Sequence, residues 1–171
     1  MTCPVKALGT VCLWFCLLVC LLVLPAVAAA QEVVFVVRHA ERADQSSDSL
    51  LSAPGEARAA HLASLLKDSG ITRIFTSELK RTIQTAAPLA EALGLTPARL
   101  APDNYEGLFA QVRASAPRDR VLIVGHSNTL PEILKRLGIA EPITIADQEY
   151  DNLFIVTSRE GAAPSLVRLR F

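Results

Sequence analysis

The sequence has few cysteines, and all of them lie near its beginning. Cys3, Cys12, Cys16 and Cys20 fall within the first 30 of 171 residues, as does the single tryptophan, Trp14. Without that segment the chain contains no thiol. Disulfide bonds, cysteine nucleophiles and cysteine-ligated metals are then excluded from it.

An excess of charge of one sign is also lacking. The chain has 17 Lys and Arg residues against 17 Asp and Glu residues, and removing Lys6 leaves 16 against 17, a net charge near −1. Such a balance gives no basic surface for nucleic acid, which is therefore not expected as a partner. The three histidines, His39, His61 and His126, are not at helical ligand spacing, so no metal and no other cofactor is expected.

Residues 1–30 have the pattern of a secretory signal peptide. Lys6 precedes a long apolar run, and this run ends in small residues that include Ala28 and Ala30. We expect cleavage before Gln31, a periplasmic or secreted location, and no stable membrane span after cleavage. The alternative is an uncleaved anchor, because the apolar stretch is long enough to cross a bilayer.

Residues 31–171 are predicted to form one domain of the α/β class. Short apolar runs rich in β-branched residues predict strands near 32–37, 71–77, 119–126, 151–159 and 164–171. Apolar residues at helical spacing, with capping, Gly and Pro signals, predict helices within 52–70, 78–94, 103–115 and 128–138. The alternation predicts a three-layer αβα sandwich with a mostly parallel sheet, in which the last two strands form an antiparallel pair.

Three of the predicted strands end in polar residues. The first ends at Arg38-His39, the second at Ser77 with Arg81 one turn into the next helix, and the third at His126. Ligands of such sheets bind at the carboxyl ends of the strands. Two arginines and two histidines from distant parts of the chain are therefore expected to meet at one edge of the sheet.

This set of side chains suits a phosphoryl group. Guanidinium groups match phosphate oxygens with paired hydrogen bonds and stay charged at any working pH. A neutral imidazole is a competent nucleophile that can carry a covalent intermediate. Because arginine already supplies the cations, phosphoryl transfer to a histidine nitrogen needs no metal ion.

Three stretches of the sequence, "VVRHAER", "SELKRTIQTA" and "VGHSNTLPE", resemble the histidine phosphatase superfamily, also called phosphoglycerate mutase-like. The Arg-His-Gly element of the family appears here as Arg38-His39-Ala40. Its Ser-x-Leu-x-Arg-x-x-x-Thr element and its late Gly-His element appear as Ser77, Leu79, Arg81 and Thr85, and as Gly125-His126.

The resemblance implies a metal-independent phosphomonoesterase that works through a phosphohistidine intermediate. By this resemblance His39 becomes phosphorylated. Arg38, Arg81 and His126 hold the phosphoryl oxygens, and His126 is expected to be protonated in that role, so that the two imidazoles differ in pKa.

The resemblance also implies an acid for the leaving alcohol, in the segment 100–109. Glu106 and Asp103 are the candidates, and we favour Glu106. The Trp-Glu-Gly element of the family's mutases is missing from this segment, which counts against mutase activity.

Four further residues are candidates for binding the substrate. Arg42 follows the expected nucleophile and either adds a cation to the pocket or lies in solvent. Ser77 is placed to donate a hydrogen bond near the site. Ser127 and Asn128 either do the same or cap the helix that follows them.

Two other functions remain as alternatives. The same fold can serve as a catalytically weak or inactive module that binds phosphate or a phosphosugar. The "GHSNT" stretch resembles the nucleophile elbow of serine hydrolases, but no histidine follows His126 to act as the base. For the phosphatase, export would favour a small phosphorylated substrate outside the cytoplasm, such as an envelope phosphosugar.

Overall fold

The computed structural model describes residues 31–115, 119–159 and 161–171, so the predicted signal peptide lies outside the described residues. The strands are β1 (Gln31–Arg38), β2 (Arg73–Ser77), β3 (Ala98–Leu100), β4 (Arg120–Gly125), β5 (Asn152–Arg159) and β6 (Ser165–Arg170). The helices are α2 (Ala53–Leu66), α3 (Lys80–Leu93), α4 (Tyr105–Arg113) and α5 (Leu130–Arg136). Within these described ranges, no helix combines the length and the apolar character needed to cross a bilayer.

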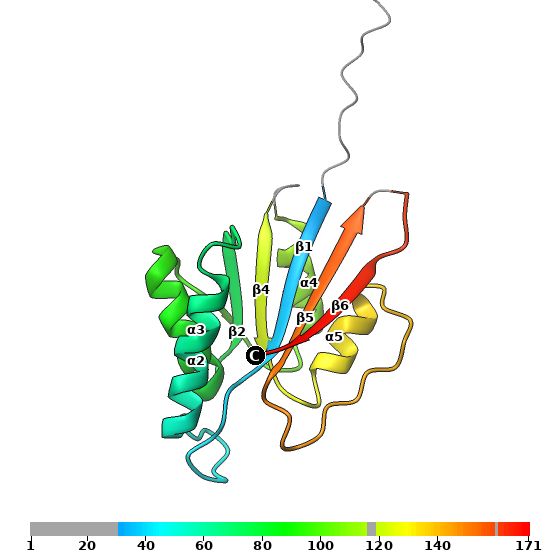
Figure 1. Ribbon diagram of the computed structural model, residues 1–171. Coiled ribbons are helices and arrows are strands. Elements are labelled where there is room, and N and C mark those ends of the chain that lie inside the picture. The colour runs from blue at the N-terminus through cyan, green and yellow to red at the C-terminus, as the bar shows by residue number, and fades with distance from the viewer. Residues whose placement is uncertain (1–30, 116–118, 160) are drawn as a thin grey trace, which may run out of the picture.

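The strands form one sheet in the order β3-β2-β4-β1-β5-β6 (Figure 1). The four strands from β3 to β1 run parallel to one another, whereas β5 is antiparallel to β1 and β6 is antiparallel to β5. The mostly parallel sheet and the terminal antiparallel pair are therefore confirmed. The pattern did not predict β3, because a strand of three residues is too short to show a period of two.

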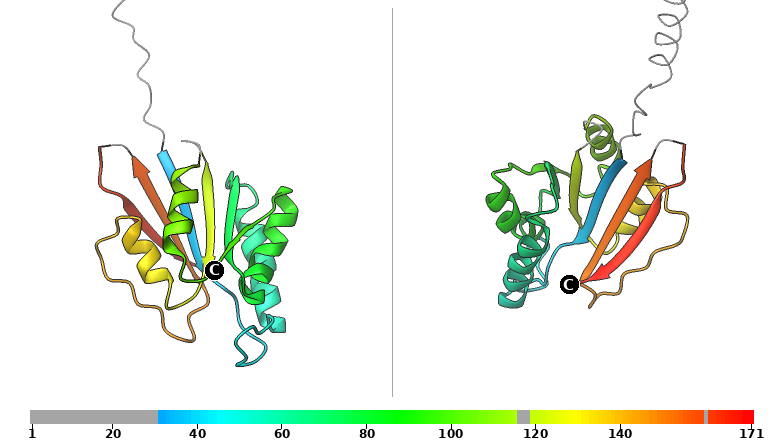
Figure 2. Two further views of the ribbon diagram at one scale, coloured as in Figure 1. Left: turned by 180° about the vertical axis from the view of Figure 1, so that it is seen from behind. Right: turned by 45° about the horizontal axis from the view of Figure 1, so that its top comes forward.

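Helices cover both faces of the sheet and complete the predicted three layers. Buried side chains of α2 and α3 pack against one face, and those of α4 and α5 pack against the other. Figure 2 shows α4 and α5 in front of the sheet when the molecule is seen from behind. Each face therefore has its own hydrophobic core.

Burial on both faces explains why the sequence of strand β1 is apolar without interruption. Val34 and Val36 belong to the core beneath α4 and α5, while Phe35 and Val37 belong to the core beneath α2 and α3. All four are almost fully buried, and each stabilises the fold by about 1.5–3 kcal/mol relative to an exposed side chain. The alternation of a strand buried on one face only is absent here because both faces are covered.

The register of the central strands brings two predicted site elements together. In the parallel pair of β1 and β4, Arg38 lies opposite Gly125. The backbone N–H of His39 then donates to the Gly125 carbonyl over 2.9 Å. The two strand ends that carry His39 and His126 are thus neighbours at the carboxyl edge of the sheet.

The chain that follows β1 is held against the start of α2. The Ser52 N–H donates to the Glu41 carbonyl over 2.9 Å, and the Ser52 hydroxyl caps α2 by accepting from the Gly55 N–H over 3.3 Å. Gly55 itself approaches so closely that a Cβ there would lie 2.3 Å from the Glu41 carbonyl oxygen. This contact fixes the direction in which the chain leaves the strand.

Candidate active site

A cavity of about 460 Å³ opens where β1, β2 and β4 end. Seven of the residues predicted from the sequence contribute to its lining, namely Arg38, His39, Arg42, Arg81, His126, Ser127 and Asn128. The other lining residues are Gln45, Leu79, Pro102, Asp147, Gln148 and Tyr150. In the described part of the chain, no three His, Cys, Asp or Glu side chains gather closely enough to hold a metal ion.

His39 is a neutral imidazole with one nitrogen left free. Its Nδ1 lies 2.8 Å from the carbonyl oxygen of Ala40. Because a carbonyl only accepts, Nδ1 carries the hydrogen and Nε2 keeps its lone pair. Burial lowers the pKa of His39 to about 3, and the nearby His126 and Arg81 act in the same direction. At neutral pH this ring is therefore able to attack through Nε2.

His126 lies beside His39, with 5.2 Å between the ring centroids. Its Nε2 is 3.0 Å from the hydroxyl oxygen of Ser77, so Ser77 lies next to the cavity and contacts a residue of its lining. Burial, followed by the charges of Arg81 and Arg38, lowers the pKa of His126 to about 4. In the ligand-free protein burial therefore favours the neutral form of both imidazoles, and the protonation of His126 beside a bound phosphoryl group stays a prediction.

Arg38 joins the floor of the cavity to the loop before β5. Its Nη1 donates to the carbonyls of Ala146 and Asp147 over 3.0 Å each and to the carbonyl of Glu149 over 3.3 Å. The guanidinium carbon lies 4.0 Å from the centroid of the Tyr150 ring, close enough for a cation–π contact. Among the described residues, no hydrogen-bond partner is found for its buried Nε.

Arg81 enters the cavity from the first turn of α3. Its Nη1 donates to the Ser47 carbonyl over 2.7 Å. Its Nε is also buried, and the described chain offers it no acceptor. Burial, followed by the charge of Arg42, lowers the pKa of the Arg81 guanidinium. A buried donor without an acceptor costs about 1–3 kcal/mol, so an anion that accepted from Arg38 and Arg81 would remove two such costs.

Thr85 connects α3 to the segment after the nucleophile. Its hydroxyl donates to the Arg81 carbonyl over 2.7 Å and accepts from the Ala40 N–H over 2.9 Å. Thr85 is almost fully buried, so both bonds are shielded from water. The threonine of the second motif therefore holds the Arg81 and His39 segments in one relative position.

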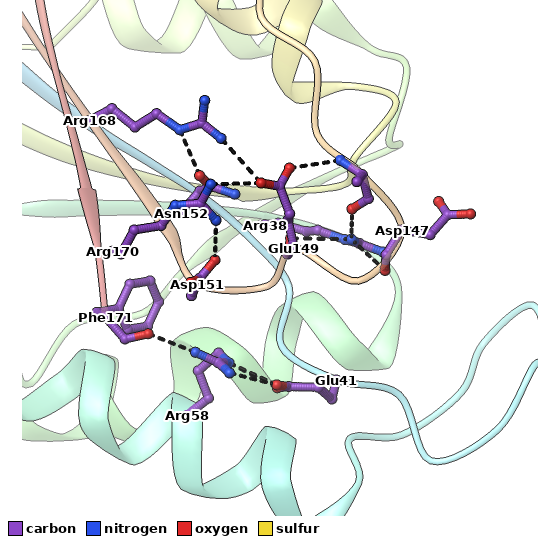
Figure 3. Close-up of polar contacts among 11 residues, drawn as sticks. Arg38, Glu41, Arg58, Asp147, Glu149, Asp151, Asn152, Arg168, Arg170 and Phe171 are labelled. Atoms are coloured by element: carbon purple, nitrogen blue, oxygen red, sulfur yellow. Dashed lines mark hydrogen bonds and ion pairs between the residues drawn. The ribbon is translucent and has the colours of Figure 1, made fainter.

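The loop that contacts Arg38 is tied down by ion pairs (Figure 3). One guanidinium, that of Arg170, donates to Asp151 and to Glu149 over 2.6 Å each. A carboxylate oxygen of Glu149 in turn accepts from the Ala146 N–H over 2.8 Å. The loop is thus fixed from β6 on one side and from Arg38 on the other.

Sequence reasoning did not place this loop in the site. None of its residues is among the candidates of the sequence analysis, whereas Asp147, Gln148 and Tyr150 line the cavity. No local motif marks these residues. The signal lies in the topology, because an antiparallel strand beside β1 must begin at the edge where β1 ends.

The structure does not bring Glu106 into the cavity. Its side chain is 81% exposed and pairs with Arg136 on α5. The hydrogen bond and charge of Arg136 lower the pKa of the Glu106 carboxyl, which favours the ionised form rather than an acid. Asp103 is exposed as well, and in the described chain neither carboxyl belongs to the lining.

The remaining predicted residues divide by their position. Ser127 and Asn128 line the cavity, and the N-cap position of α5 is occupied by Thr129, whose side chain makes no capping hydrogen bond. Arg42 also lines the cavity, and it donates to the Gln45 side chain over 2.7 Å at the rim. The prediction that these residues bind the substrate stays a prediction.

A family model matches the part of the chain that contains the first two predicted motifs. Residues 34–106 match the model of the histidine phosphatase superfamily (branch 1). Over these residues the chain is similar to members of this superfamily. The matched range contains His39 and Arg81, while His126 follows it in the chain.

Curated relatives match one part of the chain. A probable phosphoglycerate mutase GpmB of Yersinia enterocolitica is 45% identical over 69 residues, which cover 36% of this chain and 32% of that protein. The protein of the same name from Escherichia coli is 43% identical over 68 residues, with the same shares. The match thus spans about a third of the length of these relatives.

Solved structures of low sequence identity share the fold over almost their whole length. The protein histidine phosphatase SixA in complex with tungstate has a TM-score of 0.64 at 22% identity, covering 81% of this chain and 96% of its own. A mycobacterial glucosyl-3-phosphoglycerate phosphatase has a TM-score of 0.62 at 15% identity, covering 82% and 98%.

Proposed function

We propose that the protein is an exported, metal-independent phosphomonoesterase that forms a phosphohistidine at His39. One observation carries the proposal. A neutral His39 with a free Nε2 faces a cavity in which Arg38 and Arg81 each hold a buried N–H donor without a partner among the described residues. An anionic tetrahedral group would satisfy both donors while it presents phosphorus to the nucleophile.

The proposed reaction has two steps. In the first, His39 Nε2 attacks phosphorus, the N–P bond forms, and the ester P–O bond breaks in line with it. In the second, water attacks phosphorus, the N–P bond breaks, and inorganic phosphate leaves. Arg38 and Arg81 hold the non-bridging oxygens in both steps and spread the negative charge.

In this scheme His126 becomes protonated when the substrate binds. A phosphate dianion placed beside the ring favours the charged imidazolium, because an opposite charge at close range raises the pKa. His126 would then donate a hydrogen bond to a phosphoryl oxygen, as the family resemblance implies. The low pKa of the free ring keeps His126 from repelling the two guanidinium groups before the substrate arrives.

Export narrows the class of substrate. If residues 1–30 direct the chain out of the cytoplasm, intracellular phosphoglycerate and signalling phosphohistidine are out of reach. The amide side chains of Gln45, Asn128 and Gln148 in the lining suit the hydroxyl groups of a sugar. One structural neighbour is named a glucosyl-3-phosphoglycerate phosphatase, a name that contains both a sugar and a phosphate ester. For this chain we propose a small envelope phosphosugar as the substrate.

A phosphate-binding module of low or no turnover is the second candidate. The exposed position of Glu106 favours it, since the acid expected from the resemblance is not at the cavity. Such a module would keep the arginines and bind phosphate without releasing an alcohol.

Hydrolysis of p-nitrophenyl phosphate without added metal separates the two candidates. The purified protein should release p-nitrophenolate, and His39→Ala should abolish the release. Acid-free trapping with ³²P-labelled substrate should place the label on His39. Phosphate binding by calorimetry without turnover on a panel of phosphomonoesters would instead establish the module.

A further inference from the structure

The in-line geometry decides where the leaving group of the proposed reaction must lie. His39 is at the floor of the cavity and only 4% exposed. In a displacement by Nε2, the departing oxygen is on the side of phosphorus opposite to His39. That side is the mouth of the cavity, so the group that protonates the leaving oxygen has to stand at the rim.

Asp147 is the one carboxylic acid in the described lining of the cavity. The remaining lining residues are arginines, histidines, amides, hydroxyl residues and apolar side chains. An alkoxide departs from phosphorus slowly unless it is protonated, and neither an arginine nor an amide is a competent acid at neutral pH. Among the described lining residues, Asp147 is therefore the candidate carboxyl for this proton transfer.

The backbone of Asp147 is fixed while its side chain is free. Its carbonyl accepts from Arg38 Nη1 over 3.0 Å, the same guanidinium that is expected to bind phosphate. Figure 3 shows the carboxylate pointing away from that guanidinium. Within the described residues no hydrogen bond to this carboxylate is found, and the residue is exposed. The backbone of Asp147 is thus held beside Arg38, while its carboxylate forms no ion pair within the described residues.

We propose that Asp147, and not Glu106, is the proton-transfer residue of this site, an inference that rests on the proposed phosphatase function. As the P–O bond breaks, the Asp147 carboxylic acid gives its proton to the departing alcohol oxygen. As water attacks, the carboxylate takes one proton from it while the N–P bond breaks, which restores the acid.

Leaving-group dependence tests this role. We compare the wild type with Asp147→Asn, Glu106→Gln and Glu141→Gln, the last being an exposed carboxylate outside the described cavity lining. The substrates are p-nitrophenyl phosphate, whose leaving group departs without a proton, and glycerol 2-phosphate, whose leaving group needs one. For Asp147→Asn, kcat/KM for glycerol 2-phosphate should fall on the order of 10²–10⁴-fold, and kcat/KM for p-nitrophenyl phosphate should change far less.

A burst experiment tests the second step separately. If Asp147 accepts the proton of water, Asp147→Asn should show a rapid burst of p-nitrophenolate followed by slow turnover, with phosphohistidine accumulating. The midpoint of thermal unfolding should match that of the wild type, since no described contact of the side chain is lost. Glu106→Gln and Glu141→Gln should behave as the wild type with both substrates.

The outcomes are distinct. Equal losses on both substrates, or no loss, in Asp147→Asn would overturn the inference while leaving the phosphatase in place. A selective loss in Glu106→Gln would return the role to that residue. A wild type that hydrolyses neither substrate would instead refute the proposed function itself.

Discussion

The two buried histidines should make the ligand-free protein lose stability as the pH falls. In the folded state the pKa of His39 is about 3 and that of His126 about 4. In an unfolded chain an imidazole has a pKa of about 6.5. Between these values the unfolded state binds more protons than the folded state, so the free energy of unfolding decreases with decreasing pH.

The size of the effect follows from these values. The stability that each neutral ring contributes is fully present above pH 6.5 and is lost progressively as the pH falls toward the folded pKa. From pH 7.5 to pH 5.0, each histidine should lower the free energy of unfolding by about 2 kcal/mol, and the two together by about 4 kcal/mol. Both side chains are almost fully buried, so solvent screens the effect little.

Urea titrations at the two pH values measure this difference. We expect His39→Asn and His126→Asn each to lose about 2 kcal/mol less than the wild type over this interval, because asparagine does not titrate. The comparison between variants cancels the contributions of carboxyl groups elsewhere. If either variant kept the full pH sensitivity of the wild type, the burial argument for that ring would be refuted.

Three further predictions concern the framework of the cavity. Arg81→Ala should lower kcat for p-nitrophenyl phosphate on the order of 10²–10³-fold, because a preorganised charge partner is lost; turnover near that of the wild type would contradict its placement. Thr85→Val should lower the free energy of unfolding in urea by about 1–3 kcal/mol, since the Ala40 N–H loses its acceptor, whereas Thr85→Ser should keep most of it. Gly55→Ala should cost about 1–3 kcal/mol in the same assay, because the added Cβ meets the Glu41 backbone; an unchanged urea midpoint would show that this contact yields easily.

The layers of the fold could be predicted because the sequence of each core strand contains an apolar run. Strand β1 is apolar at every position from Val33 to Val37, which is expected only where helices cover both faces. Ser52 marks the start of α2 by a cap that the structure contains. The cavity could be predicted for a related reason, since residues at the carboxyl ends of parallel strands share one edge.

The rest of the site depends on contacts that no motif encodes. Glu106 lies in the segment where the resemblance places the acid, but its side chain is exposed and pairs with Arg136. Asp147 and Tyr150 reach the cavity through a connection whose course is set by β5 and by bonds to Arg38. The lowered pKa of His126 likewise arises from burial, which a linear pattern of residues does not measure.

The hydrogen bonds of Arg38 change how a mutant at this position should be interpreted. Its Nη1 binds three carbonyls of the loop before β5, so one side chain supports both the proposed anion site and the rim at which we propose that the alcohol leaves. A variant without this guanidinium would disturb phosphate affinity and substrate selectivity at once. Variation at Arg38 is therefore a poor measure of either property, and the two are separated only by changes in the loop itself.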